Sequence, residues 1–143
     1  MTDVAWKKTL LILDENEARV RAMPPAEPAP MALWCRESPH RTLGHLTACQ
    51  AAWLPLMLQI QAGATHGTIV TNPDPLYTKL GFKARPWSLL IGQFVSERAQ
   101  WREILSRIDP TLEIQTSRRV HSAQTLTRRM VEHEKRHLDA LLR

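Results

Sequence analysis

The sequence is poor in cysteine and has no long hydrophobic run. Its 143 residues include only two cysteines, Cys35 and Cys49, which are too few for a disulfide scaffold and are expected to be reduced thiols. No apolar stretch approaches the roughly 18–20 residues that a membrane span needs. The first residues also lack the basic and then apolar pattern of a secretory signal. We therefore expect a soluble, cytoplasmic protein that makes no use of a membrane.

Positive charge is in excess but is not concentrated in one stretch. The net charge is +5, and 14 of the 19 basic residues are arginines spread over every segment, with adjacent arginines at 118–119 and 128–129. Scattered basic residues are more typical of a solvated face than of a surface that reads nucleic acid. Nucleic acid is therefore not expected as a partner.

Length and composition fit a single folded domain over residues 1–143. Hydrophobic residues make up 43% of the chain and charged residues 23%, which argues against global disorder. Four segments have the spacing of amphipathic helices, and almost none favours a strand. The second helix begins with a clear signal, Ser38 followed by Pro39, and should continue towards Gly63 unless Pro55 kinks or ends it. The four predicted helices cover approximately residues 3–21, 39–62, 86–109 and 123–141.

The connection between the second and third helices is unusually long. Residues 64–85 contain Gly, Asn-Pro and Asp-Pro turn signals, and a connection of this length is expected to cross the end of the fold or to line a site. The second and third helices should therefore run parallel. A further segment, 114–120, is predicted to be extended. The fold class that follows is all-α, a four-helix bundle, in which metal sites are built from inward side chains on facing helices.

The last helix carries a motif suited to binding a metal. His133 and His137 are four residues apart, so both imidazoles stand on one face of the helix and can bind one divalent ion. His45 lies on the buried face of the second helix. These histidines are either three ligands of one metal or ordinary partly buried side chains.

Short motifs along most of the chain resemble those of the DinB/YfiT-like superfamily of metal-dependent four-helix-bundle enzymes. The matching positions are Trp34, Ser38, Leu43-Gly44-His45-Leu46, Arg98, Trp101, Thr125-Leu126 and His133-Glu134-Lys135-Arg136-His137-Leu138. The resemblance implies an up-down-down-up bundle with a long crossover between helices 2 and 3. It also implies a divalent metal (zinc, nickel or iron) held by His45, His133 and His137. Relatives of this kind use low-molecular-weight thiols or act as hydrolases or transferases, and many are homodimers.

Cys49 and Gln50 depart from the family pattern. Several relatives have an acidic residue where this chain has Gln50, and Cys49 follows His45 by one helical turn on the same face. Cys49 could therefore be a fourth ligand and close the site, which would favour a structural or regulatory metal. The alternative is that Cys49 is a small buried residue without a polar role.

Glu134 is a candidate general base beside the metal. The sequence His133-Glu134-x-x-His137 is also the zincin motif, but none of the six residues after His137 is a His, Cys or Glu that could serve as the usual third ligand, which argues against a metalloprotease. Arg98 is a candidate for binding a carboxylate of a thiol cofactor. The other histidines, His40, His66 and His121, are expected to be exposed.

Two functions are consistent with these residues. The first is a metal-dependent enzyme in which the ion activates a water or a thiol for hydrolysis or S-transfer on a small molecule. The second is a non-catalytic, metal-stabilised bundle that acts as a structural or partner-binding module.

Overall fold

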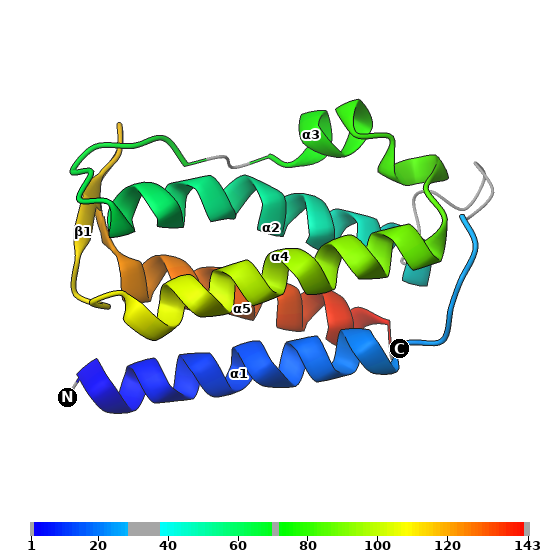
Figure 1. Ribbon diagram of the computed structural model, residues 1–143, viewed down its shortest axis with the longest axis horizontal. Helices are drawn as coiled ribbons and strands as arrows, with labels where there is room; N and C mark the ends of the chain where they lie inside the picture. Colours follow the sequence, from blue (N-terminus) through cyan, green and yellow to red (C-terminus); the bar gives the residue numbers. More distant parts are fainter. Residues whose placement is uncertain (1, 29–37, 70–71, 142–143) are drawn as a thin grey trace.

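The computed structural model describes residues 2–28, 38–69 and 72–141, and it consists mainly of four long helices (Figure 1). In chain order the elements are α1 (Thr2–Ala22), α2 (Pro39–Gln61), α3 (Asp74–Lys79), the 3-10 helix η2 (Phe82–Ala84), α4 (Trp87–Arg107), β1 (Glu113–Gln115), β2 (Val120–Ser122) and α5 (Ala123–Ala140). Trp34 and Cys35, which were singled out in the sequence, lie outside the described residues.

The four long helices have the predicted up-down-down-up order. In Figure 1, α1 and α5 run in one direction, whereas α2 and α4 both run in the other. The most extensive helix contacts are those of α2 with α4 and of α1 with α5. The long connection between α2 and α4 crosses from one end of the bundle to the other, which is why these two helices are parallel (Figure 1).

Side-chain caps define the starts of two helices, as the sequence predicts. The Ser38 hydroxyl accepts a hydrogen bond from the backbone N–H of Arg41 at 3.3 Å, and Pro39 occupies the first turn of α2. Ser122 accepts from the N–H of Thr125 at 3.1 Å at the start of α5. α2 continues through Pro55, which is exposed.

The crossover contains helical turns that the sequence did not predict. Pro73 precedes α3, and the backbone N–H of Asp74 donates to the Asn72 side chain at 3.0 Å. The segment packs closely on α2 at Gly44, where an added Cβ would lie 2.7 Å from a ring atom of Tyr77. Phe82 of η2 is fully buried. Contacts of the half-buried Tyr77 ring and the buried Phe82 with Gly44 hold this part of the crossover against α2.

A small hairpin joins α4 to α5. β1 and β2 are antiparallel, with Ile114 opposite His121, so the predicted extended segment is in fact a hairpin. The Gln115 N–H donates to the Thr65 carbonyl at 2.7 Å, and the Gly67 N–H donates to the Gln115 carbonyl at 3.0 Å. These bonds attach the start of the crossover to the end of the bundle.

The buried hydrophobic residues form two clusters along the bundle. One includes Met57, Trp101 and Met130, and the other includes Phe94 and Leu138. Among the described residues, no helix combines the length and the apolar character that a membrane crossing requires.

Candidate metal centre

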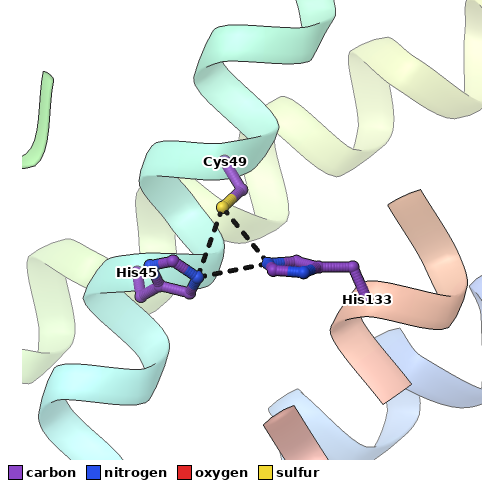
Figure 2. A group of neighbouring side chains, drawn as sticks. All are labelled: His45, Cys49 and His133. Atoms are coloured by element: carbon purple, nitrogen blue, oxygen red, sulfur yellow. Dashed lines mark hydrogen bonds between the residues drawn. The ribbon is translucent and has the colours of Figure 1, made fainter. Parts of the chain in front are cut away.

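Three potential ligand atoms from two helices converge between α2 and α5 (Figure 2). The Nε2 atoms of His45 and His133 are 3.2 Å apart. The Cys49 Sγ lies 3.6 Å from His45 Nε2 and 3.7 Å from His133 Nε2. His45 and Cys49 share one face of α2 because they are four residues apart, and α5 brings His133 to the same point.

These separations match those of a tetrahedral metal site. Zinc binds imidazole nitrogen at roughly 2.0–2.1 Å and thiolate sulfur at roughly 2.3 Å. In a tetrahedral arrangement, two such nitrogens are about 3.3 Å apart, and a nitrogen and a sulfur are about 3.6 Å apart. The three observed distances agree with this pattern without any movement of the backbone. The donor set therefore fits a divalent transition metal.

His137 lies beside this group. Its ring centroid is 4.5 Å from that of His45 and 4.6 Å from that of His133. The structure thus brings together all three predicted histidines and adds Cys49. The ligand atoms that lie within 4.8 Å of one another are those of His45, Cys49 and His133, so the tightest set contains the cysteine in place of His137.

The two kinds of donor differ in their protonation. Burial, together with the charges that His137, His45 and Arg136 can carry, lowers the pKa of His133 to about 4, so this imidazole is neutral near pH 7. Burial raises the pKa of the Cys49 thiol to about 12, and the negative charges of Glu134 and Asp74 act in the same direction. His133 is ready to bind a metal, whereas Cys49 must first release its proton.

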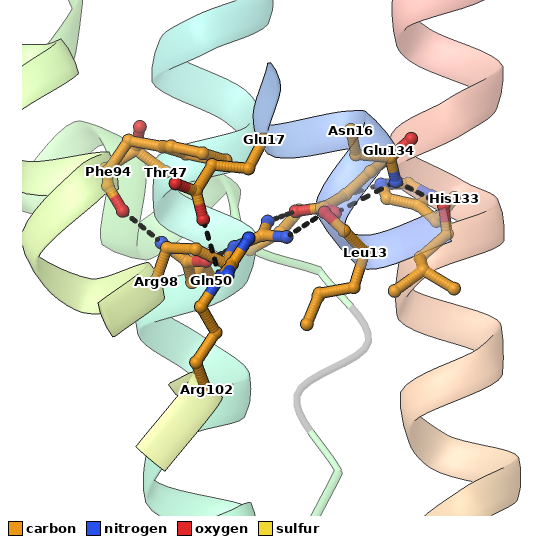
Figure 3. A network of polar contacts seen from close by, with 12 residues as sticks. Leu13, Asn16, Glu17, Thr47, Gln50, Phe94, Arg98, Arg102, His133 and Glu134 are labelled. Carbon is orange, nitrogen blue, oxygen red and sulfur yellow. Dashed lines mark hydrogen bonds and ion pairs between the residues drawn. The ribbon is translucent and has the colours of Figure 1, made fainter. Parts of the chain in front are cut away.

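A buried polar network lies directly behind the ligands (Figure 3). Arg98 of α4 is fully buried and forms an ion pair with Glu134, the neighbour of His133. The Arg98 Nε donates to the Gln50 side-chain oxygen at 2.6 Å, and Gln50 is the neighbour of Cys49. Asn16 of α1 donates to Glu134 Oε1 at 3.2 Å. The network therefore connects all four long helices at the level of the metal ligands.

The Glu134 carboxylate and the Arg98 guanidinium are paired inside the bundle. The Glu134 carboxylate is fully buried and points towards Arg98 and Asn16 (Figure 3). Burial raises the pKa of this carboxyl, and the charge of Arg98 opposes the rise. The guanidinium of Arg98 is enclosed in the core, and its role in binding a carboxylate of a thiol cofactor stays a prediction.

The remaining histidines show where the sequence reasoning was incomplete. His66 is exposed, as predicted. His40 is fully buried, and its Nε2–H donates to the Arg85 carbonyl at 2.6 Å, because the end of the crossover covers it. His121 is only 5% exposed because it faces the interior from the unpredicted hairpin. The predictions that His40 and His121 are exposed were therefore wrong.

A cavity of about 450 Å³ opens next to the converging ligand atoms. Cys49 and His133 form part of its wall. Its other lining residues are Ala52, Trp53, Ile69, Pro73, Arg129, Met130, Glu132 and Arg136. The volume lies in the range of about 300–1,000 Å³ that is usual for small-molecule sites. The candidate metal centre is thus accessible to a small ligand.

Comparisons with known proteins agree with this fold. A scan of the sequence against protein-family models finds no match, and a search of curated proteins by sequence finds none. Among solved structures, the chain is similar to YfiT from Bacillus subtilis, described as "a probable metal-dependent hydrolase with an unusual four-helix bundle topology". The match covers 96% of this chain and 83% of that chain, with a TM-score of 0.75 and 10% sequence identity. The chain therefore has a YfiT-like fold.

Proposed function

We propose that this chain, which has a YfiT-like fold, is a metal-dependent enzyme that acts on a small molecule. The observation that carries the proposal is the convergence of His45, Cys49 and His133 at distances typical of a tetrahedral site. The cavity beside them and the metal dependence stated for the YfiT structure support it further.

The proposed ligands are His45, His133 and His137, with Cys49 as an additional or alternative ligand. Zinc, nickel and iron all accept imidazole. A soft thiolate ligand favours zinc or iron among these three ions. When bound, such an ion supplies a Lewis acid that lowers the pKa of a water or thiol, and this chemistry suits hydrolysis or S-transfer. A low-molecular-weight thiol as a second substrate is part of the proposal.

The roles of the surrounding residues follow from their contacts. Arg98, Glu134, Gln50 and Asn16 hold the ligand-bearing turns of α2 and α5 in place through the buried network. A role for Glu134 as general base stays a prediction, and its buried contacts favour a positioning role instead. Trp53 and Met130 would limit the access of water to the parts of the cavity that they line.

The proposed working form is a single domain over residues 1–143 that is cytoplasmic and homodimeric. The buried free thiol of Cys49 supports a reducing compartment. Val4 and Leu11 support a dimer, because they lie seven residues apart on α1 and remain 74% and 58% exposed.

A non-catalytic module is the second candidate, and the position of Cys49 favours it. If His137 and Cys49 both bind the ion together with His45 and His133, no position is left for a substrate. The metal would then stabilise the bundle, and the cavity would bind a partner or a ligand without turnover.

Metal content tests the proposal directly. Elemental analysis of untagged protein should give close to one equivalent of a divalent transition metal, which His133→Ala should lose. His66→Ala is the matched control, because His66 is exposed and lies outside the site. The absence of metal from the wild-type protein, with no uptake of added zinc, nickel or iron, would contradict the proposal.

The part played by Cys49 is tested on cobalt-substituted protein. Ligation by the thiolate predicts a sulfur-to-cobalt charge-transfer band that Cys49→Ser abolishes. The variant should also weaken metal binding by more than the roughly 10–100-fold that follows loss of an outer hydrogen-bond partner of a ligand. If the wild-type protein shows no such band and Cys49→Ser keeps the full metal affinity, the site is made of histidines alone.

A further inference from the structure

Two arginines face the cavity without a partner among the described residues. Arg129 and Arg136 of α5 both line it, and neither forms an ion pair with another described residue. Elsewhere on the same helix, Glu134, Lys135 and Asp139 are all paired. The two guanidinium groups are therefore not used in holding the bundle together.

The positions of these arginines relate them to the metal centre. Arg129 lies four residues before His133 and Arg136 three residues after it, so the three side chains follow one face of α5. An arginine one turn away along a helix is displaced by about 5.4 Å. A small molecule whose anionic group is held by either guanidinium could thus extend as far as His133 and Cys49.

The rest of the cavity wall limits what this anion can be. Trp53, Ile69 and Met130 give the cavity wall apolar surface. Glu132 also lines the cavity, so the two arginines are opposed by one carboxylate and one net positive charge remains. This balance favours a group with a single negative charge over a doubly charged phosphate. The volume of about 450 Å³ admits a molecule of modest size.

From these features we propose that the cavity binds a small organic carboxylate with an apolar body. Arg129 and Arg136 bind the carboxylate, and Trp53, Ile69 and Met130 contact the apolar body. Guanidinium groups suit this role because their N–H donors match the two oxygens of a carboxylate. This inference rests on the proposed function and deepens it. The bound molecule would lie against His133 and Cys49, where the proposed reaction takes place.

The test uses the full chain freed of metal with a chelator, so that a metal ion cannot itself bind the carboxylate. The probe is 3-phenylpropionate, titrated by calorimetry. Its uncharged analogue 3-phenylpropionamide tests the need for the charge, and acetate tests the need for the apolar body. We expect saturable binding of 3-phenylpropionate and at least about tenfold weaker binding of the other two.

Variants locate the binding. Arg129→Gln and Arg136→Gln should each weaken binding of 3-phenylpropionate by about tenfold or more, because each removes a charge-assisted hydrogen bond. Arg128→Gln is the matched control, since Arg128 is an exposed neighbour on α5 that does not line the cavity. The indole N–H signal of Trp53 should shift on binding, which reports on the cavity itself.

The outcomes separate this inference from the proposed function. Equal binding of the amide, or no binding to the metal-free protein, overturns the inference. Binding that requires metal and is unchanged in both arginine variants also overturns it, while the metal centre stands. Conversely, arginine-dependent binding to a protein that takes up no metal supports the inference and contradicts the proposed function.

Discussion

At the scale of single residues, the candidate site combines one donor that is already deprotonated near pH 7 with one that must lose a proton to bind a metal. The imidazole of His133 is neutral near pH 7 because burial lowers its pKa to about 4. The thiol of Cys49, with a pKa raised to about 12, must lose a proton when a metal binds. A metal can supply this deprotonation, because a coordinating thiol is deprotonated outright. Metal binding should therefore be coupled to proton release.

The buried pair of Arg98 and Glu134 leads to a prediction about stability. Replacement of Arg98 by Met leaves the Glu134 carboxylate fully buried without its cation, which should reduce the free energy of unfolding by about 3–5 kcal/mol. The double variant Arg98→Met/Glu134→Leu removes both charges and should recover at least half of that loss. Urea unfolding of the metal-free protein measures both.

Metal binding is a second measurement on the same variants. Because the network attaches the turns that carry Cys49 and His133, the double variant should bind metal more weakly even where its stability recovers. A double variant as unstable as Arg98→Met would show that the loss comes from packing and not from the unpaired charge.

At the scale of elements, α5 serves three purposes with neighbouring side chains. Leu126, Met130 and Leu138 pack in the core. His133 and His137 face α2, and Arg129 and Arg136 line the cavity. A one-residue shift in the sequence of α5 would rotate all of these side chains by about 100°. The same helix therefore sets both the metal centre and the charge of the cavity.

The contact of α2 with the crossover predicts opposite effects for two glycines. Gly92→Ala on the exposed face of α4 should stabilise the protein by about 0.5–1 kcal/mol, because alanine is the better helix former and no atom lies within 4 Å of its Cβ. Gly44→Ala should gain nothing or destabilise, because its Cβ would lie 2.7 Å from the Tyr77 ring. Urea unfolding of the two variants measures the difference.

The two glycine variants check each other. Both replace a glycine inside a helix, so their intrinsic helix propensities change by the same amount. Equal stabilisation of both would mean that Tyr77 moves aside without cost and that the crossover is not held at Gly44.

At the scale of the whole molecule, the candidate metal centre lies between two helices that have few contacts with each other. α2 packs mainly on α4 and α5 mainly on α1, while contacts between α2 and α5 are fewer. The donors come from α2 and α5, so a bound ion would link the two helix pairs. With an ion bound, the site would thus be a crosslink as well as a candidate reaction centre.

This link predicts a large effect of metal on thermal stability. A ligand at about 1,000 times its dissociation constant stabilises the native state by about 4 kcal/mol. For a chain of this size, that should raise the Tm of the metal-free protein by roughly 10 °C on addition of zinc. Differential scanning calorimetry measures the shift.

The controls for this prediction come from the histidines. His66→Ala should keep the full shift in Tm, and His133→Ala should show little or none. A similar shift in both variants would mean that zinc binds elsewhere on the protein.

Much of this protein could be predicted from local sequence patterns. The capping residues Ser38 and Ser122, together with the spacing of apolar residues, determined where α2 and α5 begin and which faces they bury. The length of the crossover indicated that α2 and α4 run parallel. Periodicity on a helix also placed His133 beside His137 and Cys49 beside His45, since residues four apart share a face.

Only the tertiary structure decided which groups meet across elements. The rotation of one helix against another decides whether Cys49 reaches His133. It also decides that Glu134 points to Arg98 and away from the cavity. The burial of His40 and His121 depends on a crossover and a hairpin that cover them, and local patterns do not report such coverage. Contacts between distant segments come from packing the whole bundle, and for that reason the cavity with its two arginines became visible only in the folded molecule.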